Sequence, residues 1–311
     1  MSYQNLSGES GNRFGTALRW MLKRKRPHWP RPVQNDPFDP PPKRVEGADL
    51  RVTLVGHASV LIQTAGLNIL TDPVWSWRVG PMPGVGIRRV RPPALPFEAL
   101  PPIDLVLVSH NHYDHLDRPT LARLGRKHRS LVLTGRGCGR SIPKSAGTVL
   151  ELDWWQAHGF EGGLKVSFVP AEHFSARSPF DRNRALWGGF VLEGPAGPIY
   201  FAGDTGDGPH FAEIRQRFGP MALSLLPIGA YNPRWFMSPV HIGPEEALAA
   251  SLTLESKVSL AMHYATFPLA DDPFDEPPRL LRQGLEKARA ETDARPGLDF
   301  RLPSYGKAVE L

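Results

Sequence analysis

The chain carries the stretch DLVLVSHNHYDH at residues 104–115. Its first half, residues 104–109, is a short apolar run with polar ends, which is typical of a buried strand. Its second half places three imidazoles and one carboxylate within six positions, at His110, His112, Asp114 and His115. Imidazole nitrogen and carboxylate oxygen are the ligands that a divalent metal such as zinc accepts when no thiolate is available. The stretch therefore predicts a metal-binding loop directly after a strand.

The number of ligand groups in this loop indicates more than one metal ion. A catalytic zinc site uses three protein ligands and leaves a position for water, so four groups exceed what one ion needs. Four polar side chains this close together are also costly to bury without a cation. We therefore expect two metal ions to share the loop. The alternative is a polar surface loop rich in histidine, which the strand in front of the loop argues against.

Composition limits the classes of protein that fit. The chain has 311 residues, a single cysteine and a formal net charge of +6. Because Cys138 has no partner, an internal disulfide and a cysteine-based metal cluster are both excluded. No apolar run approaches the roughly 18 residues that a membrane span needs. The positive charge suits an anionic partner and leaves phosphate-bearing lipid, nucleic acid and small phosphate esters open.

Apolar runs of strand length alternate with turn signals along most of the chain. Strands are expected at 50–55, 60–64, 67–71, 104–109, 131–134, 165–169, 189–192, 198–202, 223–227 and 258–262. Helical patterns fall between or after them, at 119–124, 211–218, 244–254 and 277–290. Clustered strands with interspersed helices predict two mixed sheets that face each other with helices outside, in one domain spanning residues 49–311.

Residues 1–48 differ from the rest of the chain. A short amphipathic helix is expected from Asn12 to Trp20, and the basic run 23–26 and a proline-rich linker follow it. The main positive charge comes after the apolar segment, unlike a secretory signal, so we expect a cytoplasmic protein. Residues 12–29, with two tryptophans, are a candidate for peripheral contact with an anionic membrane. The alternative is a helix that packs on its own domain beside a solvated charge run.

Three further ligand candidates follow later predicted strands: His173, Asp204 and His263. A rigid sheet fixes the ends of its strands closely, which is what a set of metal ligands requires. Each residue alone has an ordinary explanation, as a loop histidine or as an aspartate that forms a turn. Together with the loop 110–115 they complete a ligand shell.

The pattern His-x-His-x-Asp-His, with a distant His, Asp and His at strand ends, resembles the metallo-β-lactamase superfamily. A closer resemblance is to the N-acylphosphatidylethanolamine phospholipase D family, whose motifs run in the same order from Leu50 to Phe267. The matching segments are GHAS at 56–59, LTDP at 70–73, SHNHYDHLD at 109–117, ELDWW at 151–155, LWGG at 186–189, FAGDTG at 201–206 and LPIGAYNPRWFM at 226–237. The resemblance implies the four-layer αββα sandwich of the superfamily.

The resemblance also implies two zinc ions per chain and a phosphodiesterase activity. One zinc would be held by His110, His112 and His173, the other by Asp114, His115 and His263, and Asp204 would bridge them together with a hydroxide. That hydroxide would attack a phospholipid phosphodiester in line. The implied reaction is that of a phospholipase D, which converts an N-acylated ethanolamine phospholipid to phosphatidic acid and an N-acylethanolamine.

Two residues join Asp114 and Asp204 as candidates for catalysis. Asp72 resembles the family's aspartate in Leu-Thr-Asp-Pro and would accept a hydrogen bond from a ligating imidazole, although it could equally be a turn residue before a proline. His241 lies where the family has histidine and would contact phosphate or stabilise the leaving group, although a lone histidine is as often structural. The residue before it is Val240, where the family usually has glutamine, so one pocket contact is expected to differ.

Other residues near these motifs have weaker assignments. His57 is expected to have a structural role beneath the site. Arg177 and Arg184 are candidates for contact with phosphate or a head group, or are solvated side chains. The segment 79–89, which is rich in glycine and proline, is expected to be a loop at the mouth of the site.

Other functions remain open at this point. One scaffold hosts many chemistries, so another metallo-hydrolase acting on a soluble phosphodiester or a sugar-phosphate lactone is the main alternative. A nuclease is disfavoured because the sequence has no evident basic nucleic-acid module, and no nucleic-acid partner is expected. A binding protein that has lost the catalytic residues of this scaffold is disfavoured, because all seven expected ligand residues are present. The sequence leaves open whether the chain forms a homodimer.

Overall fold

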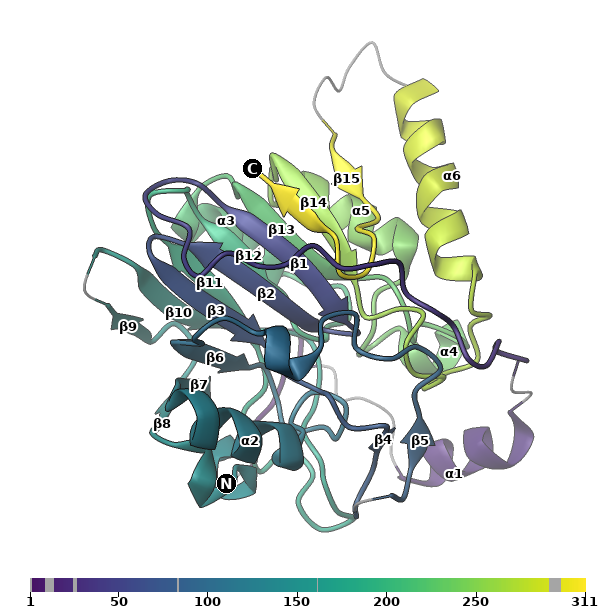
Figure 1. The fold of residues 1–311 in the computed structure, drawn as a ribbon. Coiled ribbons are helices and arrows are strands. Elements are labelled where there is room, and N and C mark those ends of the chain that lie inside the picture. Colours follow the sequence, from purple (N-terminus) through teal and green to yellow (C-terminus); the bar gives the residue numbers. More distant parts are fainter. Residues whose placement is uncertain (1, 9–13, 25–26, 83, 161, 291–297) are drawn as a thin grey trace.

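The computed structural model describes residues 2–8, 14–24, 27–82, 84–160, 162–290 and 298–311. The described chain forms two mixed seven-stranded sheets that pack face to face, with helices on the outer faces (Figure 1). This arrangement confirms the four-layer αββα sandwich expected from the sequence. A two-stranded hairpin lies beside the sandwich.

The first sheet has the strand order β16-β1-β2-β3-β6-β7-β8. Its antiparallel half consists of β16 (Ala308–Glu310), β1 (Arg51–Gly56), β2 (Ser59–Thr64) and β3 (Leu67–Thr71). Its parallel half continues from β3 through β6 (Leu105–Val108), β7 (Leu131–Gly135) and β8 (Val149–Leu152). Because β3 and β6 run in parallel, the residues that follow them meet at the same edge of the sheet.

The second sheet has the strand order β15-β14-β13-β12-β11-β10-β9. β9 (Ala157–Gly159), β10 (Lys165–Val169), β11 (Gly189–Glu193) and β12 (Ile199–Phe201) pair antiparallel. β12 then pairs in parallel with β13 (Leu223–Pro227), which leads to β14 (Val258–Met262) and β15 (Phe300–Arg301). The sheet therefore places the carboxyl ends of β12, β13 and β14 side by side.

Strand β6 shows why the apolar run before the metal loop is uninterrupted. Leu105 and Leu107 belong to the core between the two sheets, together with Phe168 of β10. Val106 and Val108 point to the opposite face and join the core under helix α2 (Arg118–His128). Successive side chains of a strand alternate between faces, so a strand that is buried on both faces needs apolar residues at every position.

Helices cover the outer faces of both sheets. On the second sheet, α3 (His210–Phe218) and α5 (Pro244–Thr253) lie side by side, and α6 (Glu276–Ala290) packs against α5 (Figure 1). Helix α5 begins at a proline, and the Glu246 side chain accepts a hydrogen bond from the backbone N–H of Gly243 at 2.6 Å. Such an arrangement satisfies a backbone donor that the first turn of a helix leaves free.

Short elements account for the differences from the sequence prediction. The sequence did not predict β8, β9, β15, β16, the hairpin strands β4 (Arg78–Val79) and β5 (Ile87–Arg88), helix α4 (Arg234–Met237) or the 3₁₀ turns η1 (Phe97–Ala99), η2 (Cys138–Ser141) and η3 (Lys144–Ala146). Elements of two to four residues carry too few positions to show a periodic pattern, and a neighbouring strand decides whether they form. The segment 79–89, expected as a loop, thus contains most of a β-hairpin.

The start of the chain packs against the sandwich. Helix α1 (Phe14–Lys23) holds Trp20, whose indole stacks on Phe236 with ring centroids 4.8 Å apart and donates to Asp271 at 2.7 Å. Arg24 donates to the other oxygen of Asp271 at 2.8 Å. Trp29 is 7% exposed and donates to the carbonyl of residue 272. Both tryptophans therefore pack on the chain itself, and contact between residues 12–29 and a membrane stays a prediction.

Parts of the predicted arm lie outside the described residues. These are the expected helix start at Asn12 and the basic residues Lys25 and Arg26. The boundary at residue 48 stays a prediction. None of the described helices is long and apolar enough to span a bilayer.

Candidate metal centre

The predicted ligands converge at one edge of the sandwich, where strands of both sheets end. The loop 110–115 follows β6 of the first sheet, whereas His173, Asp204 and His263 follow β10, β12 and β14 of the second. All are buried except His112, which is half-buried. Their side chains fall into overlapping groups whose nitrogen and oxygen atoms lie within 4.8 Å of one another. The structure therefore brings together all seven residues that the sequence offers as metal ligands.

One group consists of His110, His112 and His173. The Nδ1 atom of His112 lies 2.8 Å from Nε2 of His110 and 3.2 Å from Nε2 of His173. A zinc ion binds imidazole nitrogen at about 2.0–2.1 Å, so two nitrogens on a tetrahedral ion lie about 3.3 Å apart. Both distances are close to that spacing, and all three nitrogens lie within 4.8 Å of one another, so one ion could bind between them.

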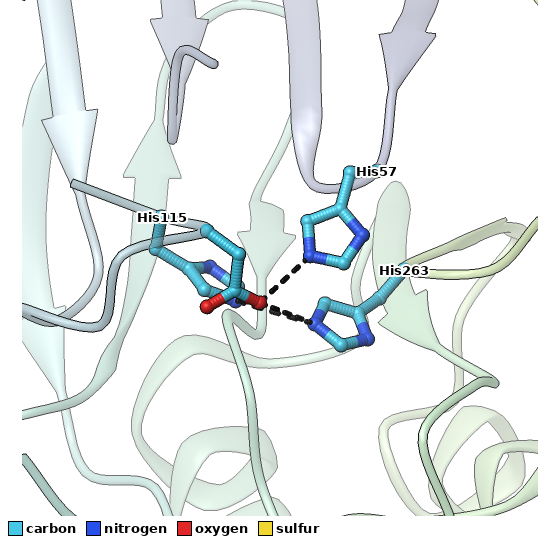
Figure 2. A group of neighbouring side chains, drawn as sticks. His57, His115 and His263 are labelled. Atoms are coloured by element: carbon cyan, nitrogen blue, oxygen red, sulfur yellow. Dashed lines mark hydrogen bonds and ion pairs between the residues drawn. The ribbon is translucent and has the colours of Figure 1, made fainter. Parts of the chain in front are cut away.

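A second group consists of His57, Asp114, His115 and His263, of which Figure 2 labels the three imidazoles. Its predicted ligands are Asp114 and the two histidines His115 and His263. The Nε2 atoms of the two histidines lie 3.2 Å apart, and Asp114 Oδ2 lies 3.3 and 3.6 Å from them. Asp204 lies between the two groups. Its carboxylate is 3.0 Å from His115 and 3.1 Å from His263, and 3.9 Å from both His110 and His173. A carboxylate in that place can bridge two cations.

Asp72 orients two of the histidines, one directly and one through Ser109. Its Oδ2 atom accepts a hydrogen bond from Nδ1 of His115 at 2.6 Å and another from the Ser109 hydroxyl at 2.6 Å. The Ser109 oxygen in turn lies 2.9 Å from Nδ1 of His110. With the protons on both Nδ1 atoms, the Nε2 lone pairs of His110 and His115 face the cluster, as metal binding requires. The expected contact between Asp72 and an imidazole is present in the structure.

The other histidine tautomers are fixed in part. His173 Nδ1 donates to the backbone carbonyl of Val240 at 2.8 Å, which leaves its Nε2 lone pair toward the cluster. The Nδ1 atom of His263 has no hydrogen-bond partner in the described part of the chain. The tautomer of His263 therefore depends on whether its Nε2 atom donates a hydrogen bond or binds a metal.

The electrostatic field of the cluster favours a cation. Burial alone would lower the pKa of His115, but Asp204, Asp114 and Asp72 outweigh it and raise that pKa well above its ordinary value. Burial is also the largest influence on His263, yet Asp204 and Asp114 raise its pKa to about 9. The same carboxylates that hold protons on these imidazoles attract a divalent metal to the same place.

The residues present fit a pair of divalent metals. Imidazole nitrogens whose lone pairs face one another at about 3 Å repel each other unless a proton or a cation lies between them. Seven nitrogen and oxygen donors with no thiolate suit zinc, iron or manganese. Among the described residues, the donor set divides into two groups that share one carboxylate. His110, His112 and His173 would hold one ion, Asp114, His115 and His263 the other, and Asp204 both.

His241 lies at the border of this cluster. Its Nδ1 atom is 4.0 Å from Asp204 Oδ2, and its ring is 5.1 Å from that of His173. Burial lowers the pKa of His241 to about 4, so the ring is neutral near pH 7 and offers one N–H. The Nδ1 atom has no hydrogen-bond partner among the described residues. A side chain in that position can reach a bound substrate.

Sequence reasoning missed two contributors to the site. His57 was expected to be structural, but its Nε2 atom lies 2.9 Å from Asp114 Oδ2. Arg177 was expected near phosphate, but its guanidinium donates to the carbonyls of Asn111 and Leu116 at 2.8 and 2.9 Å and thereby braces the metal loop. For His57, the sequence signal was a histidine between the two predicted strands 50–55 and 60–64, where a short turn usually has glycine or asparagine. Arg184 is exposed, as a solvated side chain would be.

A cavity of about 750 Å³ adjoins the metal loop at Tyr113. It is lined by the hairpin β4–β5 on one side and by Tyr113 and Arg177 on the other. The guanidinium of Arg177 lies 4.2 Å from the centre of the Tyr113 ring. The wall combines apolar with cationic side chains, including Trp77, Met82, Arg78 and Arg118. Such a cavity suits a ligand with both apolar and anionic parts.

Replacing Asp72 with alanine is expected to lower metal affinity about 10- to 100-fold, the usual effect of removing a residue that orients a ligand. The variant loses the acceptor for His115 Nδ1 and for Ser109. Zinc titration against a competing chelator measures the change. Asp49→Ala, at a residue exposed before β1, is the control. Wild-type affinity in Asp72→Ala would show that the histidines keep their orientation without it.

Comparisons with known proteins identify the family of the chain. The family model described as the beta-lactamase superfamily domain matches residues 67–264. An uncharacterized protein of Mycobacterium tuberculosis is 40% identical over 249 residues, which cover 78% of this chain and 66% of that protein. The N-acyl-phosphatidylethanolamine-hydrolyzing phospholipase D 1 of Caenorhabditis elegans is 34% identical over 256 residues, which cover 78% of this chain and 71% of that enzyme. The match thus spans just under two thirds of the mycobacterial relative.

Solved structures share the architecture. A metallo-hydrolase of the archaeon Ignicoccus hospitalis superposes with a TM-score of 0.62 at 22% identity, and the match covers 85% of this chain and 98% of the archaeal protein. At that identity the likeness concerns the fold alone. With the fold, the motif order and the relatives in agreement, the chain belongs to the metallo-β-lactamase superfamily and, within it, to the family of the N-acylphosphatidylethanolamine-hydrolysing phospholipases D.

Proposed function

We propose that this protein is a dinuclear zinc phosphodiesterase that cleaves N-acylphosphatidylethanolamine to phosphatidic acid and an N-acylethanolamine. The observation that carries the proposal is the placement of Asp204 between two ligand groups, within 3.0–3.9 Å of four imidazoles. The relatives from Caenorhabditis elegans and Saccharomyces cerevisiae, whose names state this activity, support the choice of substrate.

The ligand set supports phosphodiester chemistry. When bound, two zinc ions supply a hydroxide at neutral pH and draw charge from the phosphoryl oxygens. The chain's residues orient the parts: Asp72 fixes the imidazoles of His110 and His115, and Arg177 braces the carbonyls of the loop that carries them. The cluster is almost closed to solvent, which strengthens every charge interaction within it.

His241 is the residue that we assign to the leaving group. Its ring lies beside His173 and near Asp204, yet Nδ1 has no hydrogen-bond partner among the described residues. The oxygen of the N-acylethanolamine that leaves belongs to an alcohol, which is a poor leaving group and gains from a nearby donor. A neutral imidazole can donate its single N–H to that oxygen or to a phosphoryl oxygen.

The cavity beside Tyr113 supports a lipid substrate. Its hairpin wall exposes Trp77 (55%) and Met82 (62%), and the two hairpin strands carry Arg78 and Arg88. A phospholipid presents acyl chains to such apolar side chains and its phosphate to the guanidinium groups. A soluble phosphodiester needs no apolar surface of this kind, so the wall favours lipid over the alternative substrates.

The proposal also places the protein in the cytoplasm, in peripheral contact with an anionic membrane. Residues 27–31 of the arm and the hairpin β4–β5 line a common cavity, and both contribute basic side chains to it. Next to it, α1 exposes Leu22 (78%), and the hairpin and α1 lie at the same end of the molecule (Figure 1). Apolar side chains among basic ones match a surface of anionic lipid.

Replacing Met82 with aspartate is expected to weaken binding to anionic vesicles about tenfold, because it removes roughly 1.4 kcal/mol or more of apolar burial and adds a repelled charge. Co-sedimentation of the full chain with anionic vesicles measures the loss. Leu311→Asp is the control, because Leu311 is also exposed (39%) but lies at the opposite end of the molecule (Figure 1). Equal vesicle binding by wild type, Met82→Asp and Leu311→Asp would show that the hairpin does not contact the membrane.

The test of the proposed function is turnover of N-acylphosphatidylethanolamine by zinc-loaded protein, with the products identified by mass. Phosphatidic acid together with N-acylethanolamine is the expected result. The same assay on His112→Ala should give no product. His112 Nδ1 lies close to the nitrogens of both His110 and His173, so its loss would leave that metal position with two imidazoles. His158→Ala, at a half-buried histidine on the edge strand β9, is the matched control.

Two outcomes would contradict the proposal in different ways. Full turnover by His112→Ala would show that this cluster does not carry out the reaction. If the wild-type protein holds about two zinc ions but turns over no lipid, the metal centre is supported and the lipid substrate is not. The substrate should then be sought among soluble phosphodiesters or lactones.

A further inference from the structure

His57 occupies a backbone conformation that its side chain does not favour. It lies in the two-residue turn between β1 and β2 with a φ of +56°. Left-handed backbone costs a residue with a Cβ atom about 1–2 kcal/mol, and two-residue hairpin turns usually contain asparagine or glycine. A histidine held in this conformation beside a functional cluster indicates that its side chain has a role of its own.

The side chain of His57 is directed at Asp114. It is 2% exposed, and its Nε2 atom lies 2.9 Å from Asp114 Oδ2. Figure 2 shows the three imidazoles of His57, His115 and His263 around one carboxylate. Among the described residues Nδ1 of His57 has no hydrogen-bond partner, so we assign the proton to Nε2, which donates to Asp114. The ring also packs on His263, with centroids 3.9 Å apart.

The backbone of His57 joins the two sheets at the same point. Its carbonyl accepts a hydrogen bond from the N–H of His263 at 2.9 Å, and its N–H donates to the Thr266 hydroxyl at 3.1 Å. His57 belongs to a turn of the first sheet, whereas His263 and Thr266 follow β14 of the second sheet. His57 therefore contacts all three members of the group. Its side chain bonds to Asp114, its ring also lies 5.4 Å from that of His115, and its backbone bonds to His263.

We propose that His57 is a positioning residue for the second metal: its Nε2–H fixes the carboxylate of Asp114, and its backbone fixes His263. In the described part of the chain, His57 makes no hydrogen bond or ring contact with His110, His112 or His173. Its loss therefore affects one metal position and spares the other. The inference rests on the metal centre of the proposed function, and it is independent of the substrate.

Two substitutions separate the hydrogen bond from the packing. His57→Phe keeps an aromatic ring against His263 but removes the donor to Asp114. His57→Gln loses the ring but keeps an N–H donor at a similar reach. Zinc titration of the full chain against a competing chelator measures the affinity of each position. In His57→Phe we expect affinity at one position to fall about 10- to 100-fold with the other unchanged, whereas His57→Gln stays within about threefold of wild type.

A matched control reports on general damage. His128→Phe changes a half-buried histidine whose Nδ1 accepts a hydrogen bond from the N–H of Ile103, away from the cluster. It should bind zinc like the wild type at both positions. Circular dichroism of the metal-free proteins establishes that all variants fold.

Three results would overturn the inference. If His57→Phe binds both ions with wild-type affinity, Asp114 does not depend on the hydrogen bond. If the folded His57→Phe and His57→Gln variants lose the same affinity, the donor is not the property that matters. If the wild-type chain binds a single ion, the dinuclear centre fails and the inference fails with it, whereas two ions in the wild type and an unaffected His57→Phe reject the role of His57 alone.

Discussion

Replacing Asp204 with asparagine is expected to lower kcat/KM for the phosphodiester substrate by about 10³-fold or more, a loss of about 4 kcal/mol of transition-state stabilisation. Asp204 lies 3.0 Å from His115 and 3.1 Å from His263, and 3.9 Å from two further imidazoles. The amide has nearly the same shape but no charge, so it cannot neutralise two cations at once. The variant should also retain less zinc, which mass spectrometry under native conditions measures.

The control for this substitution is Asp207→Asn. Asp207 belongs to the same glycine-rich loop, but it is exposed, and its carboxylate accepts a hydrogen bond from the backbone N–H of Gly208 at 3.0 Å. Its conversion should leave turnover and zinc content unchanged. Wild-type turnover in Asp204→Asn, with both ions retained, would disprove the bridging role and with it the division of the ligands into two groups.

Removal of the metal with a chelator is expected to abolish turnover and to lower the thermal midpoint by roughly 10 °C. A ligand present at about 1,000 times its Kd stabilises the folded state by about 4 kcal/mol, and each kcal/mol shifts the midpoint of a chain of this size by roughly 2–4 °C. Without the metals, Asp72, Asp114 and Asp204 remain buried beside one another. Differential scanning calorimetry before and after chelation measures the shift, and added zinc should reverse it.

The matched control for chelation is His112→Ala. Because that variant should already hold less metal, the same chelator should shift its midpoint by less than it shifts the wild type. An unchanged midpoint in wild-type protein from which the zinc has been verifiably removed would mean that the cluster is stable without a cation. Protons on His115 and His263 would then be sufficient to balance the carboxylates.

The membership of the chain in its superfamily could be predicted from the order of its motifs. The spacing within residues 110–115 and the later His173, Asp204 and His263 are local features of the sequence, and each follows an apolar run of strand length. The ten expected strands all formed, because a strand buried on both faces has an uninterrupted apolar pattern that no surface element imitates. The helix after the metal loop was predicted too short, because its last turn is polar and carries no apolar signal.

The functions of His57, Arg177 and Trp20 could not be predicted in this way. Each acts on a residue far from it in the sequence: His57 on Asp114, Arg177 on Asn111, and Trp20 on Asp271. A basic amphipathic segment has the same pattern whether it faces a membrane or its own domain. Contacts of this kind depend on how two sheets are superposed, which no local pattern encodes.

The sequence by itself determined the kind of chemistry, because the ligand types and their positions after buried strands are properties of neighbouring residues. The tertiary structure decided how the ligands divide, since it sets Asp204 between two groups and turns Asp72 toward His115 and Ser109. It also decided that the turn at His57 joins the two sheets next to the group Asp114, His115 and His263. The physical reason is that a hydrogen bond of 2.6–3.3 Å depends on positions in space, and only the packing of the two sheets fixes those positions.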